Sequence, residues 1–245
     1  MNLPSHATEN WSSSTLRSEE SPKQHLQSSL TFVEDASPNP EIKEKYTFIH
    51  ITKAGGSAVE NYFKKHYSKF IMGETHSYKA EKNNKPIVIV REPIDRFVSS
   101  YHYWKNGSYD RNTRPAEFHA KYSNCSIKDY IHLIKNNIRK ELVNGFTWRE
   151  HLYKQTDWLN PAFYANSIVI IYEPNLQNKI YQLLNYINVE NKMISLPRYN
   201  ITRSKEGENV ILDEDDLVWI REHFKEDFDL WEKLHNHPEL FLKVI

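Results

Sequence analysis

The stretch YTFIHITKAGGSAVENYF, residues 46–63, decides the fold, because it joins a strand pattern to a helix pattern through two adjacent glycines. The run YTFIHI is aromatic and β-branched, which predicts a buried strand. From Gly56 onward apolar residues recur at helical spacing, and Ser57 is a candidate helix cap. The whole chain of 245 residues contains only six glycines. A pair of them at this junction lets the backbone close on a ligand, because no Cβ stands in the way.

Strand and helix patterns alternate along the rest of the chain. Short apolar runs predict further strands in KFIMG at 69–73, KPIVIV at 85–90 and SIVIIYE at 167–173. Helical spacing predicts helices in IDRFVSSYHYW at 94–104, NLQNKIYQLLNYI at 175–187 and the charged stretch 213–234, with Asp213 as its cap. The alternation predicts an α/β fold, a P-loop-like three-layer sandwich whose central parallel sheet is flanked by helices.

Composition divides the chain into two parts. Residues 1–41 are rich in Ser, Pro, Asn and Glu and show no hydrophobic period, so we expect a mobile N-terminal arm there. One short element near residues 26–33 is left open within this arm. Residues 42–245 carry the strand and helix patterns described above, and their length favours a single domain.

The charge balance excludes several classes of partner. Because 32 basic residues face 32 acidic ones, no global field recruits nucleic acid or a membrane, and an anionic ligand must be held by a local cluster. No apolar run approaches the roughly 18–20 residues that span a bilayer, and the N-terminus has no secretory pattern. A single cysteine, Cys125, suits a reducing compartment. We therefore expect a cytoplasmic protein, of undetermined oligomeric state.

The loop after the first predicted strand has the features of an anion site. A helix N-terminus presents backbone N–H groups and the positive end of the helix dipole. Lys53 adds a full charge, Ser57 adds a hydroxyl, and Gly55 and Gly56 let the backbone close on a ligand. The lysine precedes the glycines, unlike the order in a Walker A loop. The loop alone leaves two interpretations open, a phosphate site and an ordinary tight turn.

A second anion-binding element follows the strand at 85–90. Arg91 lies at the carboxyl end of that strand, which is the edge where ligands bind in open α/β sheets. Ser99 and Ser100 follow on the predicted helix. Together they can hold a second phosphate, since guanidinium supplies paired donors. The alternative is a structural salt bridge for the arginine and a packing role for the serines.

Together the two stretches resemble the PAPS-dependent sulfotransferases, in particular the carbohydrate-type branch; PAPS is 3′-phosphoadenosine 5′-phosphosulfate. FIHITKAGGSAVENYF is similar to the family's 5′-phosphosulfate loop, F-I-H-I-P-K-T-G-G-T-S, and IVIVREPIDRFVSSY to its 3′-phosphate motif, R-D-P-x-x-R-F-x-S-x-Y. Weaker similarities follow in the family's order, in HLYKQTDWL at 151–159, IVIIYEPNLQNKIYQLL at 168–184, RYNITRS at 198–204 and IREHFKEDFDLWEKL at 220–234.

Four positions depart from these family motifs. Thr52 stands where the family has proline, and Ala54 where it has threonine. Both positions serve mainly through their backbone, so we expect donor binding to survive. Ser57 keeps the hydroxyl of the usual threonine, and Glu92 replaces an aspartate.

The resemblance implies a role for each matching residue. Lys53 would stabilise the bridging oxygen as the leaving group departs, and Arg91 and Ser99 would hold the 3′-phosphate. The 5′-phosphosulfate would be held by the Ser57 hydroxyl and by the backbone of Ala54, Gly55, Gly56, Ser57 and Ala58. The family closes the nucleotide site with a late loop, so Thr202, Arg203 and Ser204 are candidates, with Arg198 and Lys205 as alternatives. The family needs no metal.

The acceptor side is less well defined. The acceptor must lose a proton, and His76 or Glu74 could take it; His titrates near neutrality. His50 is expected to be a buried structural histidine. Candidates for the acceptor pocket lie in the variable middle, and the aromatic ones could equally be core: Tyr103, Trp104, Trp148, His151 and Gln155.

Three functions remain open on these grounds. The first is sulfuryl transfer from PAPS to a hydroxyl or amine of a small polar acceptor, such as a sugar or a saxitoxin-like alkaloid. The second is a nucleotide-dependent kinase, which the lysine-first loop disfavours. The third is a non-catalytic nucleotide-binding module, which the presence of Lys53, Arg91 and Ser99 disfavours.

Overall fold

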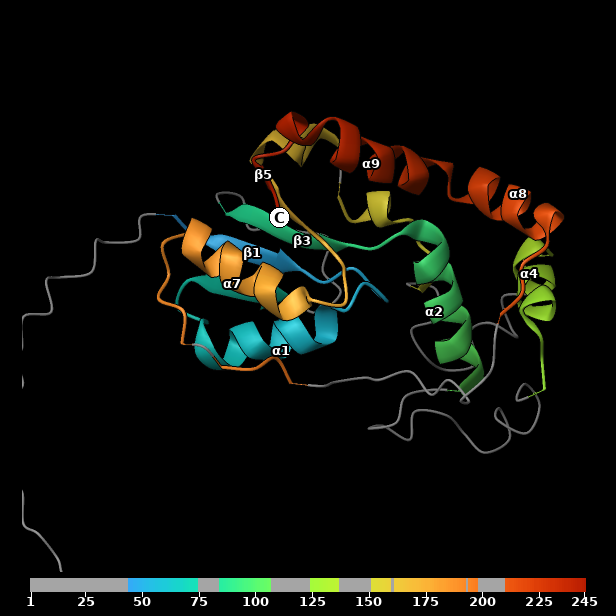
Figure 1. Cartoon of the computed structure of the whole chain (residues 1–245), viewed down its shortest axis with the longest axis horizontal. Coiled ribbons are helices and arrows are strands. Elements are labelled where there is room, and N and C mark those ends of the chain that lie inside the picture. Colours follow the sequence, from blue (N-terminus) through green and yellow to red (C-terminus); the bar gives the residue numbers. More distant parts are fainter. Residues whose placement is uncertain are drawn as a thin grey trace, which may run out of the picture. The chain divides into compact units, whose positions relative to one another are not determined.

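The computed structural model describes residues 44–74, 84–106, 124–136, 151–159, 161–192, 194–197 and 210–245. The described residues include five strands, which form one parallel sheet in the order β2-β1-β3-β4-β5 (Figure 1). The strands are β1 (Tyr46–Ile49), β2 (Ile71–Glu74), β3 (Lys85–Val90), β4 (Ile168–Ile171) and β5 (Lys243–Val244). The predicted α/β fold with a central parallel sheet is confirmed. The arm predicted at 1–41 lies outside the described residues.

The helices follow the strands in the expected alternation. They are α1 (Gly56–His66), α2 (Pro93–Asn106), α4 (Ile127–Lys135), α7 (Leu176–Tyr186), α8 (Glu214–His223) and α9 (Lys225–Asn236), with short 3-10 helices η1 (Gln155–Asp157), η2 (Pro161–Asn166) and η3 (Pro238–Leu240). Pro93 opens α2, where its missing N–H costs nothing. Asp213 caps α8 as predicted, because its side chain accepts from the Asp216 N–H at 2.9 Å.

The charged stretch 213–234 forms two helices where one helical segment was predicted. The break falls at Phe224, which has φ −109° and ψ 28°. Its ring is buried and lies 5.8 Å from the Phe97 ring of α2. The residue that separates α8 from α9 is therefore anchored in the second core by its aromatic side chain.

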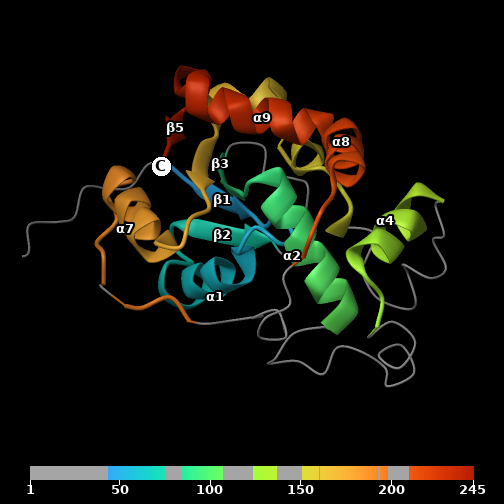
Figure 2. The ribbon, with the colours of Figure 1, turned by 45° about the vertical axis from the view of Figure 1, so that its right-hand side comes forward.

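Helices cover both faces of the sheet, as the continuous apolar strands require. Helices α1 and α7 lie on one face and α9 lies on the other (Figures 1 and 2). The main core joins all three helices to the strands and includes Phe63, Leu183 and Leu230. A second core lies between α2, α4 and α8 and includes Phe97, Tyr130 and Ile220.

The fifth strand was not predicted. β5 has two residues and pairs with β4 through Ile168↔Lys243 and Val169↔Val244. The Ile245 N–H donates to the Val169 carbonyl at 2.9 Å, which extends the pairing to the last residue. A strand this short carries no detectable period. None of the described helices is both long and apolar enough to cross a membrane.

Candidate active site

The two predicted anion-binding elements lie side by side at one edge of the sheet. β1 and β3 are hydrogen-bonded neighbours, with Phe48 opposite Ile87 and Ile49 opposite Val88. Both strands run in the same direction, so the loop after β1 and the residues after β3 emerge at the same carboxyl edge. This is the edge where open α/β sheets bind ligands.

The loop between β1 and α1 is shaped by its backbone. Lys53 has φ 61° and Gly55 has φ 81°, both in the left-handed region. Gly55 is the N-cap residue of α1 and provides no side-chain cap, so the prediction of Ser57 as the cap is wrong. Ser57 lies inside the first helical turn, which contains no acidic residue. The start of α1 thus keeps its positive dipole end uncompensated by a carboxylate of its own first turn.

Both glycines of the loop are required by close approaches. A Cβ on Gly56 would lie 2.2 Å from His50 Cδ2, and one on Gly55 would lie 2.6 Å from Tyr172 Cε2. Contacts this short do not occur between real carbon atoms. The glycine pair therefore lets the loop fit between the His50 ring and the Tyr172 ring.

His50 is held rigidly beneath the loop. It is 5% exposed, and its Nδ1 lies 2.8 Å from a carboxylate oxygen of Glu60, which is itself 5% exposed. Glu60 also accepts from Lys64 Nζ at 2.6 Å. These contacts confirm that His50 is buried, and the Cδ2 atom of its ring lies next to Gly56.

Arg91 links the two elements directly. Its Nη1 donates to the Lys53 carbonyl at 3.1 Å, and its Nε donates to Asp95 Oδ2 at 2.6 Å. The guanidinium also lies over the Tyr172 ring, 4.6 Å from its centroid. The arginine is thus oriented by three groups while its side chain stays 17% exposed.

Gln155 fixes the backbone of Arg91. The Arg91 N–H donates to Gln155 Oε1 at 2.9 Å, and Gln155 Nε2 donates to the Arg91 carbonyl at 2.8 Å. The side-chain amide therefore pairs with the strand end as a neighbouring strand would. Gln155 is completely buried. This geometry favours a role in holding Arg91 over the predicted contact with the acceptor.

Lys53 lies against an aromatic pair from the middle of the chain. Its Nζ lies 4.2 Å from the centroid of the Tyr103 ring of α2, at cation–π distance. The Tyr103 ring meets the His151 ring edge-on at 5.0 Å. Of the residues predicted near the acceptor, Tyr103 thus contacts the lysine predicted to act in transfer, and His151 contacts Tyr103.

The two serines of α2 differ in their surroundings. Ser100 is buried; its hydroxyl lies 3.1 Å from the Tyr130 hydroxyl and donates to the His151 carbonyl at 3.3 Å. Ser99 is only partly buried. Ser100 is therefore buried and hydrogen-bonded within the protein, and Ser99 is the more exposed of the two serines.

The remaining predicted residues divide into two groups. Trp104 has no exposed surface and lies in the second core, with its ring 5.0 Å from that of Tyr130, so its position favours packing over acceptor contact. The other group lies outside the described residues: His76, Trp148, Arg198, Thr202, Arg203, Ser204, Lys205 and the side chain of Glu74.

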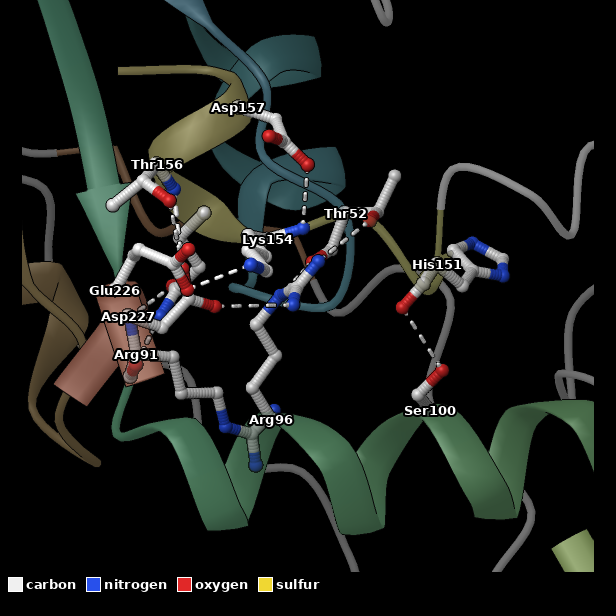
Figure 3. A network of polar contacts seen from close by, with 11 residues as sticks. Thr52, Arg91, Arg96, Ser100, His151, Lys154, Thr156, Asp157, Glu226 and Asp227 are labelled. Carbon is white, nitrogen blue, oxygen red and sulfur yellow. Dashed lines mark hydrogen bonds and ion pairs between the residues drawn. The ribbon is translucent and has the colours of Figure 1, made fainter. Parts of the chain in front are cut away.

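A buried arginine that was given no role in the sequence interpretation lies at the centre of the polar network in Figure 3. Arg96 Nε donates to the Thr52 carbonyl at 2.9 Å, and Nη1 lies 3.8 Å from Asp227 Oδ2. Asp227 accepts from the Thr156 N–H at 3.2 Å. Burial lowers the pKa of Arg96 and raises the pKa of Asp227, and the attraction between the two charges opposes both shifts. The signal that could have identified Arg96 is its place in the 3′-phosphate motif.

The two strand-end loops bring an arginine, a lysine and a helix N-terminus to one edge of a parallel sheet, an arrangement typical of α/β proteins that bind anionic ligands. The sequence model of the sulfotransferase family matches residues 41–233. The chain therefore belongs to the sulfotransferase family, in its family 2 branch, and is a PAPS-dependent sulfotransferase. Searches of curated proteins and of solved structures returned no match.

Proposed function

We propose that this protein transfers the sulfuryl group of PAPS to a hydroxyl or amine of a small polar acceptor, within a domain spanning residues 42–245. One observation carries the proposal: Arg91 Nη1 donates to the Lys53 carbonyl at 3.1 Å. This contact brings together the groups expected to bind the two ends of the donor. A donor with phosphates at both ends needs such a pair of anion sites on one face.

The donor-binding groups have distinct tasks. The loop from Ala54 to Ala58, at the start of α1, presents N–H groups to the 5′-phosphosulfate, together with the Ser57 hydroxyl. Arg91 and Ser99 bind the 3′-phosphate, since guanidinium matches phosphate geometry. Thr202, Arg203 and Ser204 are the proposed contacts from the late loop.

Transfer breaks the bond between sulfur and the bridging phosphate oxygen while a bond to the acceptor oxygen or nitrogen forms. Lys53 neutralises the charge that develops on the leaving phosphate oxygen. The acceptor proton passes to a general base, for which His76 is the first candidate and Glu74 the second. Lys53 and Arg91 supply the positive charge, so we propose that the reaction proceeds without a metal ion.

The acceptor approaches from the side of Tyr103, whose ring contacts Lys53 and the His151 ring. Both rings provide an apolar face with a polar edge, which suits a polar molecule of modest size such as a sugar or a hydroxylated alkaloid of the saxitoxin kind. We place this activity in the cytoplasm, the reducing compartment expected from a single cysteine.

The test is a titration with adenosine 3′,5′-bisphosphate (PAP), the desulfated donor, followed by thermal unfolding. A ligand that binds only the folded state at a hundredfold excess over its Kd should raise the melting temperature by about 5–10 °C. We expect this shift in the native protein and not in Arg91→Ala. Arg221→Ala is the matched control, because that arginine lies exposed on α8. An absent shift, or an equal one with ATP and Mg²⁺, would contradict the proposal and favour a module or a kinase.

A further inference from the structure

Lys53 adopts a backbone conformation that an L-residue rarely takes. Its φ of 61° lies in the left-handed region, and among the described residues only Asn188 shares this feature outside glycine. The conformation is unfavourable because Cβ approaches the carbonyl oxygen of the same residue. Such conformations persist only where the surrounding structure imposes them, and they cluster at functional sites.

Two arginines hold the peptide groups on either side of Lys53. Arg96 Nε donates to the Thr52 carbonyl at 2.9 Å, and Arg91 Nη1 donates to the Lys53 carbonyl at 3.1 Å. The first carbonyl belongs to the peptide plane before the Lys53 Cα, and the second to the plane after it. Because φ and ψ are rotations of these two planes about that Cα, the two contacts together restrain both angles.

The Arg96 contact is anchored deep in the protein. Arg96 is 2% exposed and Asp227 of α9 is 1% exposed, with 3.8 Å between Nη1 and Oδ2. Arg96 Nη2 also donates to Thr52 Oγ1 at 3.3 Å. Asp227 in turn accepts from the N–H and the hydroxyl of Thr156, at 3.2 and 3.4 Å. Figure 3 shows this chain of contacts leading from α9 and η1 through Arg96 to Thr52.

We infer that Arg96, anchored by Asp227, is a positioning residue for Lys53. It fixes the peptide plane that precedes the lysine, imposes the left-handed conformation, and so sets the direction in which the lysine side chain leaves the loop. The effect on the loop follows from the contacts alone. Its consequence for sulfuryl transfer rests on the proposed function.

The competing explanation is a purely structural ion pair in the core. It also predicts that Arg96→Lys destabilises the fold, because a lysine keeps the charge but cannot reproduce the guanidinium's simultaneous contacts with Thr52 and Asp227. The two explanations differ in whether that substitution interacts with the conformation of Lys53. A double-mutant cycle measures this interaction directly.

The first cycle combines Arg96→Lys with Lys53→Gly and follows the melting temperature without ligand. Glycine takes the left-handed conformation without penalty, so Lys53→Gly relieves strain only while Arg96 imposes it. Its effect on the melting temperature should be about 2–4 °C more favourable in the native background than in Arg96→Lys. Equal effects in the two backgrounds would overturn the inference.

Two further variants keep this cycle decisive. Asp227→Asn replaces Arg96→Lys if the latter does not fold, because it weakens the anchor and keeps the shape of the side chain. Lys105→Met is the matched control: Lys105 is a buried cation of the same helix that donates to the Tyr101 hydroxyl at 3.1 Å. With Lys105→Met the effect of Lys53→Gly should be unchanged.

The second cycle measures PAP affinity by calorimetry. We expect Arg96→Lys to weaken PAP binding roughly tenfold in the native background and less than twofold in Lys53→Ala, because the arginine acts through the lysine. Equal losses in both backgrounds would show that Arg96 acts independently of Lys53 and would overturn the inference. Failure of the native protein to bind PAP would refute the proposed function, while the ligand-free cycle would still decide the role of Arg96 in the loop.

Discussion

Two segments lead from a buried parallel strand into the start of a helix, yet they are built in opposite ways. The first segment, residues 50–59, joins β1 to the first turn of α1, and the second segment, residues 91–96, joins β3 to the first turn of α2. The first uses glycine, a left-handed lysine and an N-cap residue without a side-chain cap. The second uses charged side chains: the Glu92 carboxylate accepts from the Asp95 N–H at 2.6 Å, and Asp95 lies in the first turn of α2. The start of α2 is thus compensated by the chain's own carboxylates, and the start of α1 is not.

This difference assigns a task to each segment. A helix start with its own carboxylates has little to gain from a bound anion, and one without them has more to gain. The segment after β3 also supplies the arginines whose contacts reach the Thr52 and Lys53 carbonyls. We therefore propose that the start of α1, and not the start of α2, binds an anion. The second segment holds the first in place through Arg91 and Arg96, and its Arg91 also faces the 3′-phosphate in the proposed complex.

The largest effect is expected from removing the one full charge of the first segment. Lys53→Ala should lower the rate of sulfuryl transfer by about 10²–10³-fold, the range for loss of one group that stabilises charge in the transition state. The rate is measured with labelled PAPS and an acceptor found by screening. Alanine keeps the Cβ of residue 53 and therefore the same backbone strain, so the substitution should leave the melting temperature within about 2 °C of the native value. A variant that retains a tenth of the native rate would contradict the role of Lys53.

The next largest effect is expected on stability, from the close approach between Gly56 and the His50 ring. Gly56→Ala places a methyl group 2.2 Å from His50 Cδ2, so we expect a loss of stability of about 1–3 kcal/mol from overpacking. The loss is measured by urea unfolding. Combining Gly56→Ala with His50→Ala removes the obstacle, and the cost of the methyl group should then largely disappear. An equal cost in both backgrounds would show that the glycine is required for another reason.

A carboxylate added to the first turn of α1 should compensate the positive end of its helix dipole, as Asp95 does in the first turn of α2. Ala58→Glu places an acidic side chain in the first turn of α1, where it should raise the melting temperature of the free protein by about 1–3 °C. The same charge should weaken PAP binding roughly tenfold, since like charges close together repel. Ala58→Gln, without the charge, is the control. Stability and affinity that move in the same direction would contradict the assignment of α1 as the anion site.

The contrast between the two segments was only partly predictable from the sequence. β1, β3, α1 and α2 follow from short apolar runs, helical spacing and the placement of glycine and proline. The anion-binding character of the first segment was predicted because lysine, glycines and a helix start are adjacent in the chain. Such local signals need no tertiary information.

The contacts by which Asp227 and Gln155 hold Arg96 and Arg91 in place were not predictable, because the residues that meet are distant in sequence. Asp227 lies in a stretch so rich in charge that its burial leaves no local signal. Gln155 was expected near the acceptor, whereas its amide pairs with the Arg91 backbone at 2.8 and 2.9 Å. In both cases the fold brings together a polar side chain and a backbone group that no periodicity connects.

The smallest effect is expected from removing Glu92, which caps the start of α2. Glu92→Ala removes the acceptor of the Asp95 N–H, and loss of such a cap costs about 1 kcal/mol, or about 2–4 °C in melting temperature for a protein of this size. PAP affinity should change less than twofold, because the proposed donor contacts do not include the start of α2. Glu92→Gln keeps an acceptor oxygen and should recover most of the stability. A loss of affinity in Glu92→Ala at unchanged stability would mean that the start of α2 also contacts the ligand, and the contrast between the two helix starts would fail.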